Sequence, residues 1–251
     1  MKYRIPPAAT LAALMALAAL MTACTPPGLQ PVQAPATAAA PAGFPADSYT
    51  QAAAQGQRVL RVEPGRSLLT LTVRRGGTLA QFGHDHVVAS QALQGYVAPE
   101  QERADPGRAD PGRADLYLAL DSLTVDDAAL RADAGLDTQP SAEDIAGTRA
   151  NMLTKVLQTQ EFPFALIHVR APAALAGDTL LAVDITLHGV TRSFSVPARV
   201  QTQPGGLQVS GMLAFDQSSF GITPFSILGG AIQVQDRVEL RFDVQARDLA
   251  P

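Results

Sequence analysis

The residues best suited to metal or ligand chemistry are the two histidines of His84-Asp85-His86. Residues two apart on a β-strand face the same side, so these imidazoles could form one edge of a metal site. Such a site needs further ligands, and the only other histidines are His168 and His188. Because Gly83 precedes the pair, we favour the interpretation that both side chains cap a turn at a barrel mouth. Contact with a ligand headgroup is the next alternative, and a metal site is the last.

The remaining polar residues give little support for catalysis. His168 continues an apolar face, and His188 precedes Gly189 in a turn, which are settings typical of structural histidines. Asp126-Asp127 is typical of a helix start. No serine stands in a nucleophile elbow, and the chain has no phosphate loop, dinucleotide fingerprint or zinc-protease spacing. We therefore expect neither an enzyme nor a cofactor. The net charge of −4 and the lack of a basic run also argue against nucleic-acid binding.

Cys24 is the only cysteine of the chain, and its position is informative. Lys2 and Arg4 precede an uninterrupted apolar run over 11–21, and small residues lead from there to Cys24. This order is typical of a secretory signal, and the run has about half of the roughly 20 residues that span a bilayer. The pattern resembles a bacterial lipoprotein signal, which implies that Cys24 is lipidated and becomes the new N-terminus. The alternative is an ordinary signal peptide with a chance cysteine.

Composition divides the chain into three parts. Residues 1–23 are the expected signal peptide, and residues 24–57 are an Ala- and Pro-rich stretch that predicts an extended linker. Residues 58–251 are long enough to form one folded domain without a disulfide. We expect this domain in the cell envelope, facing the periplasm and anchored to a membrane through its lipid.

Alternation of apolar and polar residues predicts that this domain is all-β. The pattern gives each strand one dry and one wet face, which is typical of antiparallel sheets. A sandwich or a closed barrel buries such faces, and a barrel also removes exposed edges. One helix interrupts the pattern over about 141–158, where Ser141 and Asp144 suggest a capping box. The strongest alternating stretches are 69–73, 116–120, 181–187, 194–200, 207–215 and 238–244.

Five segments, in order along the chain, resemble the YceI-like proteins. They lie between about Val59 and Ala246 and comprise Arg61–Val73, Leu120–Asp127, Phe162–Phe164, Leu187–Arg192 and Ser219–Ile222. The chain departs from the family pattern at Glu63 and Arg66, where Asp and His are usual. The resemblance implies a lipocalin-like, eight-stranded antiparallel barrel with one helix across an end. It also implies an apolar lumen that holds polyisoprenoid chains such as quinone or polyprenyl tails.

The dry faces supply the candidate lumen residues. An eight-stranded barrel is close to the size at which the interior is either filled by side chains or holds one small ligand, so a filled core is the alternative for each of them. Arg66, His84 and His86 are the candidates for contacting a headgroup at the mouth. The lumen candidates are Leu118, Leu166, Val183, Ile185, Leu187, Phe194, Val196, Val209, Leu213, Phe215, Leu240 and Phe242.

These expectations lead to one function and two alternatives. The first is a membrane-tethered carrier or sequestering protein whose partner is an amphipathic lipid, such as an isoprenoid or a quinone. Each buried methylene contributes about 0.8 kcal/mol, so a long tail can bind without a polar anchor. The alternatives are a metal-assisted hydrolase that uses His84 and His86, and a ligand-free structural protein of the envelope.

Overall fold

The computed structural model describes residues 39–99, 101–102, 109–171 and 176–249. The chain divides into two compact units, 1–33 and 34–251, and the described residues belong to the second. The expected signal peptide, Cys24 and the first part of the linker lie outside the described residues. In the described part, no helix is both long and apolar enough to cross a membrane.

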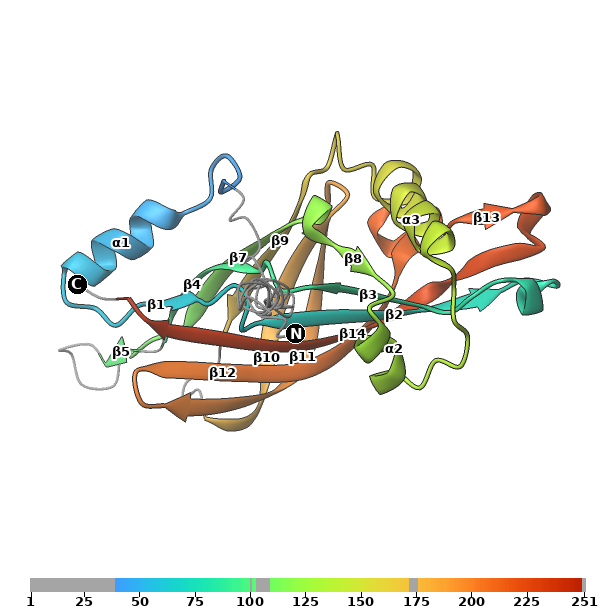
Figure 1. Cartoon of the computed structure of the whole chain (residues 1–251). Helices are drawn as coiled ribbons and strands as arrows, with labels where there is room; N and C mark the ends of the chain where they lie inside the picture. The colour runs from blue at the N-terminus through green and yellow to red at the C-terminus, as the bar shows by residue number, and fades with distance from the viewer. Residues whose placement is uncertain (1–38, 100, 103–108, 172–175, 250–251) are drawn as a thin grey trace, which may run out of the picture. The chain divides into compact units, whose positions relative to one another are not determined.

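Eight strands form a closed antiparallel barrel (Figure 1). The ring closes because the last strand, β14, pairs with both β12 and β1. The predicted all-β, eight-stranded antiparallel barrel is therefore confirmed. In order around the ring the strands are β1 (Leu60–Val62), β4 (Gln94–Ala98), β7 (Arg113–Ala119), β9 (Phe164–Arg170), β10 (Gly177–Leu187), β11 (Val190–Gln203), β12 (Gly206–Asp216) and β14 (Ile232–Asp248).

β14 is long enough to change partners along its length. Its first part pairs with β2 (Leu68–Gly76), and its end pairs with β1. β3 (His86–Ser90) continues the sheet beside β2, and β8 (Thr124–Val125) follows β3. The side chain of Ser67 fills the break between β1 and β2, since its fully buried Oγ accepts from the Gln245 amide at 3.1 Å and donates to the Glu63 carbonyl at 3.1 Å. The wall stays hydrogen-bonded where the strand bends.

Helices and short strands connect the strands of the barrel. The predicted helix near residue 141 is present as α3 (Ala142–Asn151), which continues into a π-helical turn, η3 (Met152–Val156). Ser141 and Asp144 form the expected capping box. Ile145 and Met152 turn towards the core. The other short elements are β5 (Gln101–Glu102), β6 (Ala109–Asp110), α2 (Ala128–Asp133), β13 (Ser226–Ile227), and the 3₁₀ turns η1 (Ala80–Phe82), η2 (Leu120–Ser122), η4 (Gln217–Phe220) and η5 (Leu228–Gly230).

A helix also occurs where the composition predicts a spacer. Helix α1 (Ala46–Ala54) carries Tyr49, whose side chain is completely buried. The Tyr49 ring stacks on Tyr96 at 5.3 Å between centroids, and its hydroxyl donates to Asp115 Oδ2 at 2.7 Å. Burial, followed by the bond to the Asp115 carboxylate, raises the pKa of Tyr49 well above its usual value. Ordered structure therefore begins before residue 58, and the second part of the expected linker packs on the barrel.

Candidate functional site

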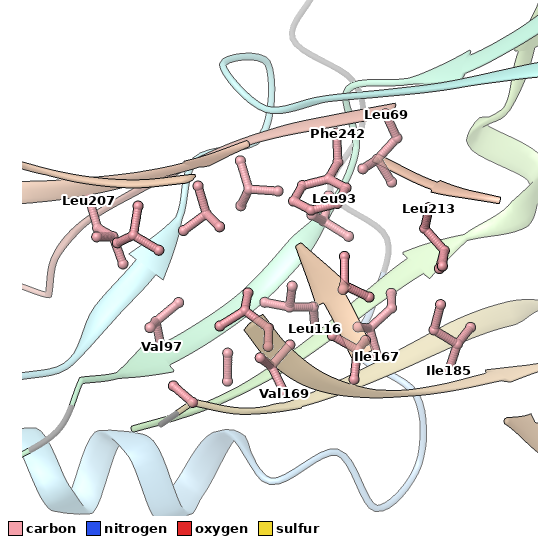
Figure 2. Close-up of a pocket in the computed structure, with 18 of the residues that line it drawn as sticks. Leu69, Leu93, Val97, Leu116, Ile167, Val169, Ile185, Leu207, Leu213 and Phe242 are labelled. Carbon is pink, nitrogen blue, oxygen red and sulfur yellow. The ribbon is translucent and has the colours of Figure 1, made fainter. Parts of the chain in front are cut away.

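The barrel encloses an apolar cavity of about 160 Å³. Its walls come from every strand of the ring except β1, together with Leu69 of β2 and Leu93 (Figure 2). Arg113 is the only charged lining residue in the described part of the chain, and Phe242 is the only aromatic one. All the other lining residues are Leu, Ile, Val or Ala. A cavity with these walls attracts apolar molecules and offers few hydrogen-bond partners to polar ones.

Seven of the predicted lumen residues line this cavity. Val183 and Ile185 lie on β10, and the neighbouring strands contribute the others from the same inward face. Their position fits the expected lumen, and a direct role in ligand binding stays a prediction. The seven are Val183, Ile185, Val196, Val209, Leu213, Leu240 and Phe242.

Four other predicted lumen residues do not line this cavity and pack against neighbouring core side chains. Phe194 and Phe215 pack around Phe220 of η4, with ring centroids 5.4–6.2 Å apart. Phe220 is completely buried and fills the interior here. Leu187 packs against the same cluster, while Leu118 lies in the cluster of Leu120 and its neighbours. These four residues are on the apolar faces of their strands, as predicted, but they contact other core side chains and not the cavity.

The prediction for Leu166 is wrong. Its side chain is 38% exposed and lies on the outer face of β9, whereas Ile167 and Val169 face the cavity. The outer face of β9 carries Phe164 and Leu166 as well as the polar His168, and the segment 41–45 lines a hollow of about 280 Å³ over this face. Alternation therefore could not identify the inward face of this strand.

Sequence reasoning missed the rest of the lining. Six of the missed residues stand in alternating stretches, so the pattern that gave the other candidates also marks them: Leu69, Leu116, Leu181, Val200, Leu207 and Val244. Leu93 lies between β3 and β4, where no alternation exists. The other residues that were missed are Val97, Arg113, Ala114, Ile167, Val169 and Ala171.

A glycine on the inner face makes room for the aromatic lining residue. Gly211 pairs with Phe242 across β12 and β14. A Cβ atom at Gly211 would lie 2.6 Å from Phe242 Cζ and 2.6 Å from the Pro197 carbonyl oxygen. The Phe242 ring therefore lies directly over the Gly211 backbone, a close approach that only glycine permits.

His86 belongs to a buried ionic network. Its Nδ1 lies 2.6 Å from Asp126 Oδ2, and Asp126 Oδ1 accepts from Arg131 at 2.5 Å and from the Val87 amide at 3.0 Å. Burial alone would raise the pKa of Asp126, but the bonds from His86, the Val87 amide and Arg131 outweigh it and lower that pKa. Asp127 is the N-cap of α2, as the helix-start interpretation expects, whereas Asp126 is a buried structural carboxylate.

The three headgroup candidates do not line the cavity. Arg66 lies at the surface beside Glu63 and Gln245. The ring centroid of His84 is 6.3 Å from that of His86, and its buried Nδ1 has no hydrogen-bond partner among the described residues. Across those residues, no group of three or more His, Cys, Asp or Glu side chains is placed to hold a metal ion. A headgroup role for Arg66, His84 or His86 stays a prediction.

Comparisons with solved structures match the fold. A polyisoprenoid-binding domain from Saccharophagus degradans, implicated in plant cell wall breakdown, shares 13% sequence identity at a TM-score of 0.52, over 76% of this chain and 98% of that one. BcnA from Burkholderia cenocepacia shares 16% identity at a TM-score of 0.50, over 73% of this chain and 98% of that one. No curated protein matches the sequence significantly.

The family model for the YceI-like domain matches residues 71–246. The match covers well over half of the chain and includes most strands of the barrel ring and every lining residue of its cavity except Leu69. The resemblance seen in the sequence motifs is thereby confirmed, and the chain belongs to the YceI-like family.

Proposed function

We propose that this protein is a membrane-tethered carrier or sequestering protein that binds an isoprenoid or another amphipathic lipid in its barrel. The observation that carries the proposal is the cavity wall, in which aliphatic side chains surround the interior and Arg113 is the only charged residue described. An apolar tail that leaves water for this interior gains about 0.8 kcal/mol for each buried methylene. The wall offers no comparable gain to a sugar or a peptide.

Family membership supports the choice of ligand class. The relative from Saccharophagus degradans is described as a polyisoprenoid-binding domain. Leu, Ile and Val side chains match the branched, flexible shape of an isoprenoid tail without requiring directional contacts. A binding role in which the protein catalyses nothing also agrees with the structural use of His86 and Asp126.

The size of the cavity limits how the ligand binds. About 160 Å³ is close to an engineered apolar cavity that holds benzene, and below the roughly 300–1,000 Å³ of typical ligand pockets. A tail of several isoprene units therefore requires wall side chains to change rotamer or part of the tail to extend beyond the cavity. The exposed Arg113, whose guanidinium lies 5.0 Å from the Tyr49 ring centroid, provides a polar group at the edge of the wall.

The tether is the second part of the proposal. The signal-like segment ending at Cys24 and the Ala/Pro-rich residues after it support a lipid anchor in the cell envelope. An anchor would hold the barrel close to the membrane that contains its ligand.

Mass spectrometry of an organic extract from the purified full-length protein tests the lumen. We expect a prenyl-containing or similar amphipathic lipid, and a strong loss of it in Val183→Phe, whose larger side chain fills the cavity. The matched control is Ala182→Phe, because Ala182 is the exposed neighbour on the outer face of the same strand. An unchanged lipid content in a folded Val183→Phe protein would contradict binding in this cavity.

A further inference from the structure

Three of the six exposed large apolar side chains among the described residues lie at one end of the barrel. Two of the most exposed in the described chain are Phe82, at 68%, and Leu228, at 70%, and Ile227 beside Leu228 is 45% exposed. Phe82 ends η1 in the connection from β2 to β3, and the other two lie in β13 and η5 before β14. Figure 1 shows β13 and the β2–β3 connection at the same end.

The two loops form one unit, which we call the uncharged tip (residues 77–83 and 226–231). β2 and β14 are paired as far as Gly76 and Gln233, and the Leu79 amide then donates to the Ala231 carbonyl at 2.8 Å. Gly77 has φ +90°, and a Cβ there would lie 2.4 Å from the Ala231 oxygen. The backbones of the two loops are therefore in contact, and the three exposed side chains belong to these two loops.

The uncharged tip and the residues directly behind it differ in charge. The tip contains no Asp, Glu, Lys or Arg, although such residues make up 17% of the chain. Directly behind it, Arg74 and Arg75 share the single carboxylate of Asp85. An uncharged apolar end with arginines behind it matches a lipid bilayer, whose acyl region excludes charge and whose headgroups include anionic phosphates.

The conformation of the tip presents these side chains to solvent. Leu228 has φ 51°, a left-handed conformation that is uncommon outside glycine, and its side chain is nevertheless exposed. Neither the strained backbone nor the exposed leucine stabilises the barrel itself. Such a combination persists where a loop serves a purpose other than stability.

We infer that the uncharged tip is a membrane-docking site, with Phe82, Ile227 and Leu228 inserting into the headgroup–acyl boundary of a bilayer. The inference goes beyond lipid binding in the cavity and does not depend on it.

Site-specific fluorescence on the full-length protein tests this docking. Phe82→Cys and Leu228→Cys variants carry an environment-sensitive nitrobenzoxadiazole label and are mixed with vesicles of phosphatidylethanolamine and phosphatidylglycerol. We expect a shift of both emission maxima to shorter wavelength, together with quenching by lipids that carry a doxyl group near the headgroup. Wild-type protein labelled in parallel measures any contribution from Cys24.

Met212→Cys is the matched control, because Met212 is 60% exposed on the barrel wall, away from the tip. Its label should remain in water even when the protein is held on the vesicle. The inference is overturned if the labels at 82 and 228 stay aqueous, or if the label at 212 shifts equally. Burial of the tip labels that depends on protein concentration and not on vesicles would show a contact between copies and would also overturn it.

Discussion

At the scale of single residues, the best-defined polar interactions of this protein are those around Asp126, and they stabilise the fold. Asp126 is buried and has φ 57°, a left-handed conformation, yet three donors from β3 and α2 converge on its carboxylate. Arg131 also donates to the carbonyls of Asp85 and Thr138. The network therefore joins β3, α2 and the chain before α3. Its interactions explain why an ionised carboxylate is stable in a buried position.

Replacing this carboxylate should be costly near neutral pH. Asp126→Asn leaves Arg131 and His86 without their acceptor charge, so we expect a loss of about 3 kcal/mol in the free energy of unfolding. The folded-state pKa is lowered, so the stabilisation is present above the unfolded value near 4 and is lost as pH falls through the folded pKa. Urea titrations should therefore show the gap between wild type and variant at pH 7 and its narrowing below about pH 4.

Asp127→Asn is the control for this experiment. Asp127 Oδ1 accepts from the amides of Ala129 and Leu130 at the start of α2, and asparagine caps a helix about as well as aspartate. Its stability should stay close to that of the wild type. A pH-independent loss in Asp126→Asn would mean that shape, rather than ionisation, explains the effect.

The inward-facing residues could be recognised from the sequence where one face of a strand is apolar and the other polar, although their role in ligand binding stays a prediction. Val183 and Ile185 on β10 are clear examples. The same reasoning failed for Leu166, because the outer face of β9 also carries apolar side chains. It also could not separate Phe215, which packs on Phe220, from Leu213, which lines the cavity, since both share a face of β12.

At the scale of elements, the N-terminal helix α1 packs on the barrel although the sequence pattern did not predict it. Alternation predicted β2, β7, β10, β11, β12 and β14 but not the ring strands β1, β4 and β9, and the capping residues predicted α3. α1 escaped prediction because its sequence is mostly Ala and polar residues, and because a single tyrosine accounts for most of its burial. The Tyr49 hydroxyl donates to Asp115 on β7, and no local sequence pattern predicts this long-range hydrogen bond.

Removing α1 should weaken the barrel without unfolding it. A chain that begins at Arg58 retains every strand but exposes the surface that Tyr49 covers. We expect a β-dominated circular dichroism spectrum and a loss of about 1.5–3 kcal/mol relative to a chain that begins at residue 39, which corresponds to burial of one large side chain. Tyr49→Ala in the longer chain should reproduce most of that loss. Equal stabilities in urea would show that α1 contributes nothing to the barrel.

At the scale of the whole molecule, three features can act on the same membrane. The cavity provides an apolar interior, the uncharged tip provides an apolar exterior, and Cys24 supplies the expected anchor. The tip alone exposes only three large side chains, which is a weak membrane signal compared with a pair of acyl chains. Stable residence at the membrane should therefore depend on the anchor, and the tip should decide which end of the barrel meets the bilayer.

Cys24→Ser tests the anchor. In the proposed lipoprotein, lipid attachment and the processing that requires it both depend on Cys24, so the variant should lose stable membrane association. Cells expressing the full-length variant are fractionated, and the membrane pellet is washed with high salt to remove electrostatic attachment. Thr22→Ser, which keeps a small hydroxyl residue in the segment before Cys24, is the control and should remain in the pellet. A Cys24→Ser protein that is cleaved normally and still resists the salt wash would show that the tip, or another surface of the barrel, is sufficient to hold this protein on the membrane.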